Sequence, residues 1–357
     1  MRILDGRTFV FVAFDIGFEI DLEAATALLD ASRAPGLRLR RPAPPSLRYP
    51  AAPVELALPD HHLSDGTAAT VSARIFDFGV VSLAFTLPAP ERLAELPGRA
   101  RFLLHDAALA DAALGAVRGL AERVRPAVGR FAISDILEEY LIFQVSDLEG
   151  TPTASRLLRE EGTRIAAALA LEPGLLDDSY VAEVLAGRVS YSPEDVVLSD
   201  WSAAFVYDTE YPDTVAVLEF LNIQLLELRF QDARLDRALE GVAAVRRGPG
   251  GLGAFLNPYR QPVRLLAELT IESTLLSERV TNAMKLLGDD YLARVARRAA
   301  ERLRLADWEA SIRRKQDAVA TLYTRMNDRL VALRGEALEL AIVLLIILEI
   351  ALWVTGQ

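Results

Sequence analysis

The C-terminal end of the chain carries the sequence feature that most restricts its fold. Leu338–Val354 is a run of 17 residues that is almost entirely aliphatic. At about 1.5 Å per residue, such a helix spans about 26 Å, close to the roughly 30 Å hydrocarbon core of a bilayer. Trp353 stands where an aromatic side chain would meet the membrane interface. We therefore predict a single C-terminal transmembrane helix over 338–354; the alternative is a buried helix of an oligomer.

The residues around this run predict its orientation. Arg329 and Arg334 come just before it, which favours a cytoplasmic location for residues 1–335 and a tail-anchored protein of a bacterial inner membrane. Glu349 lies inside the run, and a carboxylate within lipid costs about 2.5–3.5 kcal/mol. We expect Glu349 to lie near the far interface or in the interior of an oligomer.

Composition excludes several classes of function. The chain has 357 residues with a net charge of −11, so we expect no direct contact with nucleic acid. It has no cysteine and three histidines, and no motif for a nucleotide or a nucleophile, so we predict no catalytic residue, no cofactor and no metal. The histidine pair in Asp60–Asp65 is interpreted as part of a solvated loop.

The chain changes character near residue 208. Before it, alternating runs such as Val81–Leu87 indicate strands mixed with helices; after it, three long helices are expected, at about 212–246, 261–304 and 306–354. The predicted fold is therefore α+β, in three parts. An N-terminal mixed α/β head spans 1–208, a long antiparallel helical hairpin or coiled-coil stalk spans 209–335, and the transmembrane helix spans 338–354.

Polar residues are embedded in the first long helix, in a segment whose first half carries apolar residues on every side. Buried polar groups must be paired. They form either an internal hydrogen-bond network that fixes the position of the helix, or a polar patch at an oligomer or ligand interface. The candidate residues are Glu219, Asn222, Gln224, Glu227 and Arg229.

Two carboxylates, Asp208 and Glu210, stand beside Tyr207 and Tyr211 at the entry to this helix. Acidic residues stabilise a helix N-terminus, so capping is expected here rather than catalysis.

One resemblance adds to these patterns. The string Val-Leu-Glu-Phe-Leu-Asn-Ile-Gln-Leu-Leu-Glu-Leu-Arg-Phe-Gln-Asp over 217–232 is followed by Leu235-Asp236, a predicted helical hairpin and the aliphatic C-terminal run. This combination resembles the "required for meiotic nuclear division" family, also called domain of unknown function 155. The resemblance implies a membrane-anchored homo-oligomer with no established enzyme activity. In that family, mitochondrial relatives support translation by holding ribosomes near the membrane.

Our first hypothesis is a non-enzymatic, membrane-anchored oligomeric scaffold. It would tether a cytoplasmic partner, the ribosome or another protein, at the bilayer. The alternative is an oligomeric membrane transport or ion-responsive protein whose tails line a path near Glu349. An enzyme hidden in the head is a third hypothesis.

Overall fold

The computed structural model describes residues 1–31, 38–40, 52–245 and 289–355. The chain divides into two compact units. The first comprises Met1–Phe230 and Glu278–Trp308, and the second comprises Gln231–Ser277 and Glu309–Gln357.

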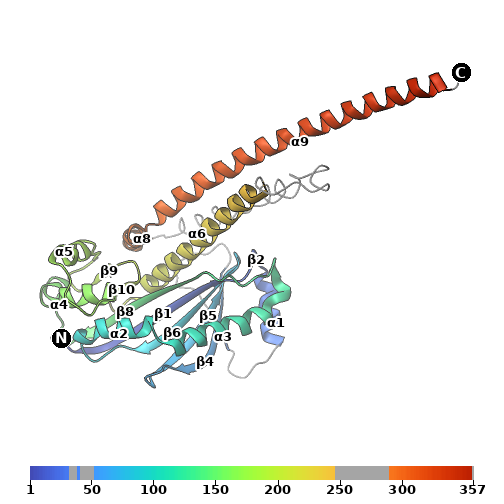
Figure 1. The fold of residues 1–357 in the computed structure, drawn as a ribbon. Helices are drawn as coiled ribbons and strands as arrows, with labels where there is room; N and C mark the ends of the chain where they lie inside the picture. Colours follow the sequence, from blue (N-terminus) through green and yellow to red (C-terminus); the bar gives the residue numbers. More distant parts are fainter. Residues whose placement is uncertain (32–37, 41–51, 246–288, 356–357) are drawn as a thin grey trace. The chain divides into compact units, whose positions relative to one another are not determined.

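The first unit is a mixed α+β structure built on an eight-stranded sheet, in the order β3-β4-β5-β6-β1-β8-β10-β9 (Figure 1). Neighbours pair antiparallel except β8 and β10, which are parallel. The central strand, β1, pairs with β6 on one edge and β8 on the other. The strands are β1 Ile3–Asp15, β3 Arg38–Arg40, β4 Val54–His62, β5 Ala68–Ile75, β6 Val80–Pro88, β8 Leu137–Leu148, β9 Val196–Ser199 and β10 Ala203–Tyr207; β2 Glu19–Ile20 and β7 Val128–Gly129 form a separate pair.

The described helices belong to three parts of the chain. Five short or medium helices follow or separate the strands: α1 Leu22–Ala31, α2 Leu96–Leu104, α3 Ala107–Val124, α4 Ala154–Leu169 and α5 Asp178–Ala186. The long helix α6 runs over Pro212–Val245, and α8 Asp290–Arg302 and α9 Leu305–Thr355 follow the undescribed segment. The predicted helix over 261–304 lies largely outside the described residues, as does the predicted hairpin turn.

One face of the sheet packs on the short helices to form the main core. Val10, Val12 and Phe14 alternate along β1 and join a buried cluster with helix residues such as Val117. Figure 1 shows α2 and α3 lying along this side of the sheet. Alternation of side chains directs the other set of β1, Phe11 and Ala13, to the opposite face, where they are also buried.

The first half of α6 lies on this opposite face of the sheet, where a row of mostly polar side chains crosses five strands. Glu55, Arg74, Ser82, Ala13 and Glu138 are consecutive neighbours on β4, β5, β6, β1 and β8. These are one-to-one pairs in register, so the five side chains share one face of the sheet. We call this set the polar row.

The polar residues predicted on α6 meet this row. Glu219 is 2% exposed and accepts a 2.7 Å hydrogen bond from Ser82 Oγ while it pairs with Arg74. The Asn222 amide donates to the Glu138 carbonyl oxygen at 3.3 Å, and Arg229 pairs with the Glu138 carboxylate. The structure therefore brings Glu219, Asn222 and Arg229 together over the sheet.

Gln224 and Glu227 lie on the same helix and are also buried. The Gln224 Oε1 atom accepts no hydrogen bond from any described residue. Glu227 has no exposed surface.

The predicted transmembrane helix is corrected by the structure. Among the described residues, no helix combines the length and the hydropathy that a membrane span requires. The run 338–354 is not a separate element but the end of α9, a 51-residue helix that is polar over much of its length and holds Glu339 and Glu349 within that end. The predictions of a transmembrane helix, a tail anchor and an inner-membrane location are therefore wrong. The transport hypothesis loses the membrane helix on which it rested.

The second unit contains the rest of α6 and most of α9. Lys315 Nζ lies 2.7 Å from both Asp232 and Asp236, which are one helical turn apart on α6. Ile312 and Val319, one turn before and after Lys315 on α9, are buried. This part of α9 thus carries a buried apolar seam that contains one ion-paired lysine.

The hairpin turn between β5 and β6 requires glycine at position 79. Gly79 has a φ of +98°, and a Cβ at this position would lie 1.8 Å from the Gly17 carbonyl oxygen. Gly66 also has a positive φ, +83°, but a Cβ there would meet nothing within 4 Å.

We expect Gly79→Ala to lower the free energy of unfolding by about 3 kcal/mol or more. The positive φ alone costs roughly 1–2 kcal/mol for an L residue, and the backbone contact adds to it. Gly66→Ala is the matched control and should lose only the cost of its φ. Urea denaturation of both variants measures the difference; equal losses would contradict the role of the Gly17 contact.

The stability of the fold is expected to depend on pH through Glu138. Burial raises the pKa of Glu138 from 4.5 to about 7, against the opposing effect of Arg229. A carboxyl with a raised pKa binds its proton more tightly in the folded state. Its stabilising contribution is therefore present below pH 4.5 and is lost as the pH rises through 7, by on the order of 3 kcal/mol in total.

Glu138→Gln keeps a neutral side chain at every pH. We expect the stability of this variant, relative to the wild type, to rise between pH 4.5 and 7.5. Urea denaturation across that range measures the effect. Stability curves that stay parallel would show that Glu138 does not titrate differently on folding.

Candidate functional site

A cleft of about 1100 Å³ opens in the first unit where four segments meet. They are the end of β8 with the loop that follows it, the turn before β9, the connection from β10 into the start of α6, and the start of α8. We call this the acidic cleft, because no described lysine, arginine or histidine lines it. Its carboxylates are Asp147, Glu194, Asp195, Asp208, Glu210, Asp213 and Asp289.

Asp195 forms hydrogen bonds that join two of the segments lining the cleft. Its side chain is 8% exposed and accepts hydrogen bonds from the backbone N–H groups of Tyr191, at 2.8 Å, and Ser192. It also accepts a 3.2 Å hydrogen bond from the Tyr291 hydroxyl, which ties α8 to the turn before β9. Asp289 begins α8 by accepting a 3.0 Å hydrogen bond from the N–H of Leu292.

Other carboxylates of the acidic cleft remain available to a ligand. Asp147, Glu194 and Glu210 form no ion pair with any described residue. Glu194 and Glu210 are exposed, and Asp147 is half-buried. The cleft therefore presents negative charge that the described chain does not neutralise.

Three tyrosines line the acidic cleft together with the carboxylates. Tyr191 is 79% exposed and its ring meets the Tyr291 ring edge-on, with centroids 5.9 Å apart. Burial raises the pKa of Tyr291, and the charges of Asp195 and Asp208 raise it further. Burial likewise raises the pKa of Tyr207, with Asp147 and Glu194 adding to the effect. Both hydroxyls thus stay protonated and able to donate hydrogen bonds.

The pKa of Asp208 is also raised, first by burial and then by the neighbouring Asp195 and Glu210 carboxylates. Its side chain accepts a 2.8 Å hydrogen bond from the N–H of Glu210. This hydrogen bond closes a short turn just before α6 begins at Pro212. The role of Asp208 at the start of the helix is therefore structural. Asp208 and Glu210 are the part of the acidic cleft that the sequence singled out.

Carboxylates beside exposed aromatic rings favour cationic ligands. An ammonium or guanidinium group gains Coulombic attraction from the carboxylates and cation–π attraction from a ring face. The carboxylates come from four segments and are spread along the lining, which suits several positive charges on one ligand. In the described ranges, no three His, Cys, Asp or Glu side chains are grouped to hold a metal ion.

The other sequence candidates lie elsewhere. Glu219, Asn222, Gln224, Glu227 and Arg229 belong to α6 and do not line the acidic cleft.

At the C-terminus, the backbone of Glu349 and Trp353 is part of α9. The histidine pair lies at the end of β4, a strand rather than the loop that was expected, and the His61 ring packs edge-on against Phe85.

Comparison with known proteins gives a family but no activity. Residues 5–213 match the family described as "Uncharacterized protein MJ0711, N-terminal domain". A relative from Methanocaldococcus jannaschii, "Uncharacterized protein MJ0711", is 23% identical over 225 residues, which cover 62% of this chain and 68% of the relative. No solved structure matches the chain.

The family match covers the sheet except for the first two residues of β1, together with α1–α5 and the connection into α6. It includes every residue of the acidic cleft except Thr214 and those at the start of α8. Since the matched region is more than half of the sequence, the chain belongs to the family of the N-terminal domain of uncharacterized protein MJ0711.

Proposed function

We propose that this protein is a non-enzymatic oligomeric scaffold whose first unit binds a positively charged segment of a partner protein. The observation that carries the proposal is the acidic cleft, with its seven carboxylates, three tyrosines and no described basic residue. Its volume of about 1100 Å³ suits a segment with several lysine or arginine side chains rather than a single small cation. The resemblance to the domain of unknown function 155 family would make the ribosome the partner, and that stays a prediction.

The expected binding mode follows from the lining. Glu194 and Glu210 at the exposed rim would attract and pair with basic side chains, and Tyr191 would cover one of them with its ring. Exposed ion pairs contribute about 0.2–1 kcal/mol each and weaken as salt is added. The affinity should therefore be moderate, with the free energies of several contacts adding up, and it should fall strongly as the ionic strength rises.

A labelled oligo-lysine peptide tests the cleft by fluorescence anisotropy. We expect the double variant Glu194→Gln/Glu210→Gln to weaken binding roughly 5- to 10-fold, in line with two exposed ion pairs. Tyr191→Ala should weaken it a further few-fold. Asp111→Asn, which removes an exposed carboxylate on α3, is the matched control and should bind as the wild type does.

Two results would contradict the proposal. One is wild-type affinity in the double variant. The other is an equal loss in Asp111→Asn, which would show that net charge rather than the cleft attracts the peptide.

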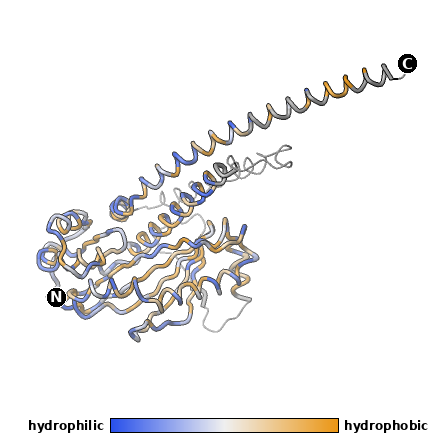
Figure 2. The backbone as a smooth tube through the Cα atoms, viewed as in Figure 1, coloured by the Kyte–Doolittle hydropathy of each residue, from blue (hydrophilic) through white to orange (hydrophobic). Residues whose placement is uncertain are grey.

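The oligomeric part of the proposal is supported by the end of α9. Ile342–Ile347 are six consecutive aliphatic residues, each between 48% and 64% exposed in the single chain. Figure 2 shows the most hydrophobic colours of α9 gathered toward this end. A contiguous apolar surface of this kind on a helix favours association. We propose that a second copy of the chain covers it, helix against helix.

We expect light scattering after size-exclusion chromatography to give a multiple of the 39.1 kDa chain mass for the wild type. Leu345→Glu/Ile346→Glu places charges on the apolar surface and should reduce the mass to that of one chain. Ala320→Glu, an exposed position nearer the start of α9, is the control and should leave the mass unchanged. A double variant with wild-type mass would place the oligomer contact elsewhere.

A further inference from the structure

A second pocket lies in the first unit and has the opposite charge. Its volume is about 530 Å³, and four arginines line it: Arg188, Arg294, Arg297 and Arg298. Glu301 is the one carboxylate among the described lining residues. We call this the arginine pocket. Its lining carries a net charge of about +3, in a chain whose net charge is −11.

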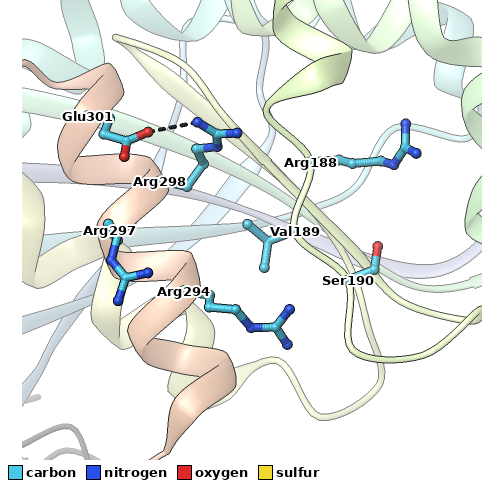
Figure 3. A pocket seen from close by; sticks show the side chains of 7 residues that line it. All are labelled: Arg188, Val189, Ser190, Arg294, Arg297, Arg298 and Glu301. Carbon is cyan, nitrogen blue, oxygen red and sulfur yellow. Dashed lines mark hydrogen bonds and ion pairs between the residues drawn. The ribbon is translucent and has the colours of Figure 1, made fainter.

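The fold builds the two walls of the arginine pocket independently of any ligand. One wall is α8, whose buried side includes Val295 and Ala299, so that the arginines at 294, 297 and 298 fall on its exposed side. The other wall is the segment that follows α5. Val189 fixes this segment by exchanging two backbone hydrogen bonds with Val197, at 2.8 and 2.9 Å. Figure 3 shows the two walls facing each other.

The charges of the pocket are only partly neutralised. Arg298 donates a 2.8 Å bond to Glu301, and Arg294 lies 3.6 Å from Asp290, which is 94% exposed. Arg188 and Arg297 form no ion pair with any described residue. Like charges held together in this way repel one another, and a bound anion would remove the repulsion.

We propose that the arginine pocket binds an oligophosphate group, either the diphosphate or triphosphate part of a small molecule or a free inorganic diphosphate or triphosphate. Guanidinium groups match phosphate oxygens with paired, charge-assisted hydrogen bonds. An anion with three or four negative charges balances the net charge of the lining. Val189 is the only apolar residue in the described lining, so the pocket recognises the phosphates and offers little to an aromatic base.

The neighbouring acidic cleft argues for a compact anion rather than a nucleic acid. Ser190 lines the arginine pocket, and the next residue, Tyr191, lines the acidic cleft. A long polyanion that left the pocket on this side would approach Glu194 and Asp195 and be repelled. An oligophosphate ends within the pocket and avoids them.

Binding requires one rearrangement of a side chain. In Figure 3 the Arg188 side chain extends away from α8. Arg188 is exposed, and exposed side chains change rotamer within nanoseconds. Rotation of Arg188 would allow guanidinium groups from both walls to reach the same anion.

Isothermal titration calorimetry of the full chain with inorganic tripolyphosphate tests the proposal, with a nucleoside triphosphate as the second titrant. We expect both to bind, and Arg188→Gln/Arg297→Gln to weaken both at least 10-fold. Glu301→Gln frees Arg298 and should tighten binding a few-fold. Arg156→Gln, an exposed arginine on α4, is the control and should behave as the wild type does. Thermal unfolding of each variant verifies that it is folded.

Binding of tripolyphosphate alone would assign the site to a free inorganic oligophosphate, and equal binding of both would assign it to the shared phosphate chain. Absence of binding to the wild type would overturn the proposal, as would unchanged affinity in Arg188→Gln/Arg297→Gln. A single-stranded RNA that binds through the same arginines while tripolyphosphate does not would also overturn it.

Discussion

The contact between α6 and the polar row fixes the position of α6 on the sheet. A helix that is apolar on every side could slide along an apolar sheet, because hydrophobic burial has no direction. Two sets of polar contacts remove that freedom, since each buried charge must keep its own partner. Glu219 bonds to Ser82 and Arg74. Arg229 pairs with Glu138. The position of α6 then determines where its N-terminus and the preceding turn lie, and this turn is one wall of the acidic cleft.

The sequence predicts one half of this contact and not the other. Polar residues embedded in an apolar helix signal buried pairing, so the local pattern on α6 is enough to identify Glu219, Asn222 and Arg229. Their partners cannot be identified in this way, because strand register brings residues of β5, β6 and β8 into one row across long stretches of chain. Register depends on long-range pairing that no local pattern encodes.

The acidic cleft shows the same limit. Asp208 and Glu210 are visible as a pair beside tyrosines, but Asp147, Glu194 and Asp289 come from segments far apart in the chain.

The wrong prediction of a transmembrane helix over 338–354 has a different cause. Length and hydropathy favour a membrane helix there, whereas the run continues a long helix and contains two carboxylates, Glu339 and Glu349.

The place of β1 in the sheet also has a consequence for synthesis on the ribosome. β1 precedes both of its neighbours in the chain, and its partner β8 begins only at Leu137. A nascent chain therefore carries a 13-residue, largely apolar strand with one edge unpaired until much of the first unit has been made. Exposed strand edges of this kind are the sites where chains aggregate before they fold. Slow elongation or a chaperone that covers β1 should thus affect the yield of folded protein more than changes to the later helices.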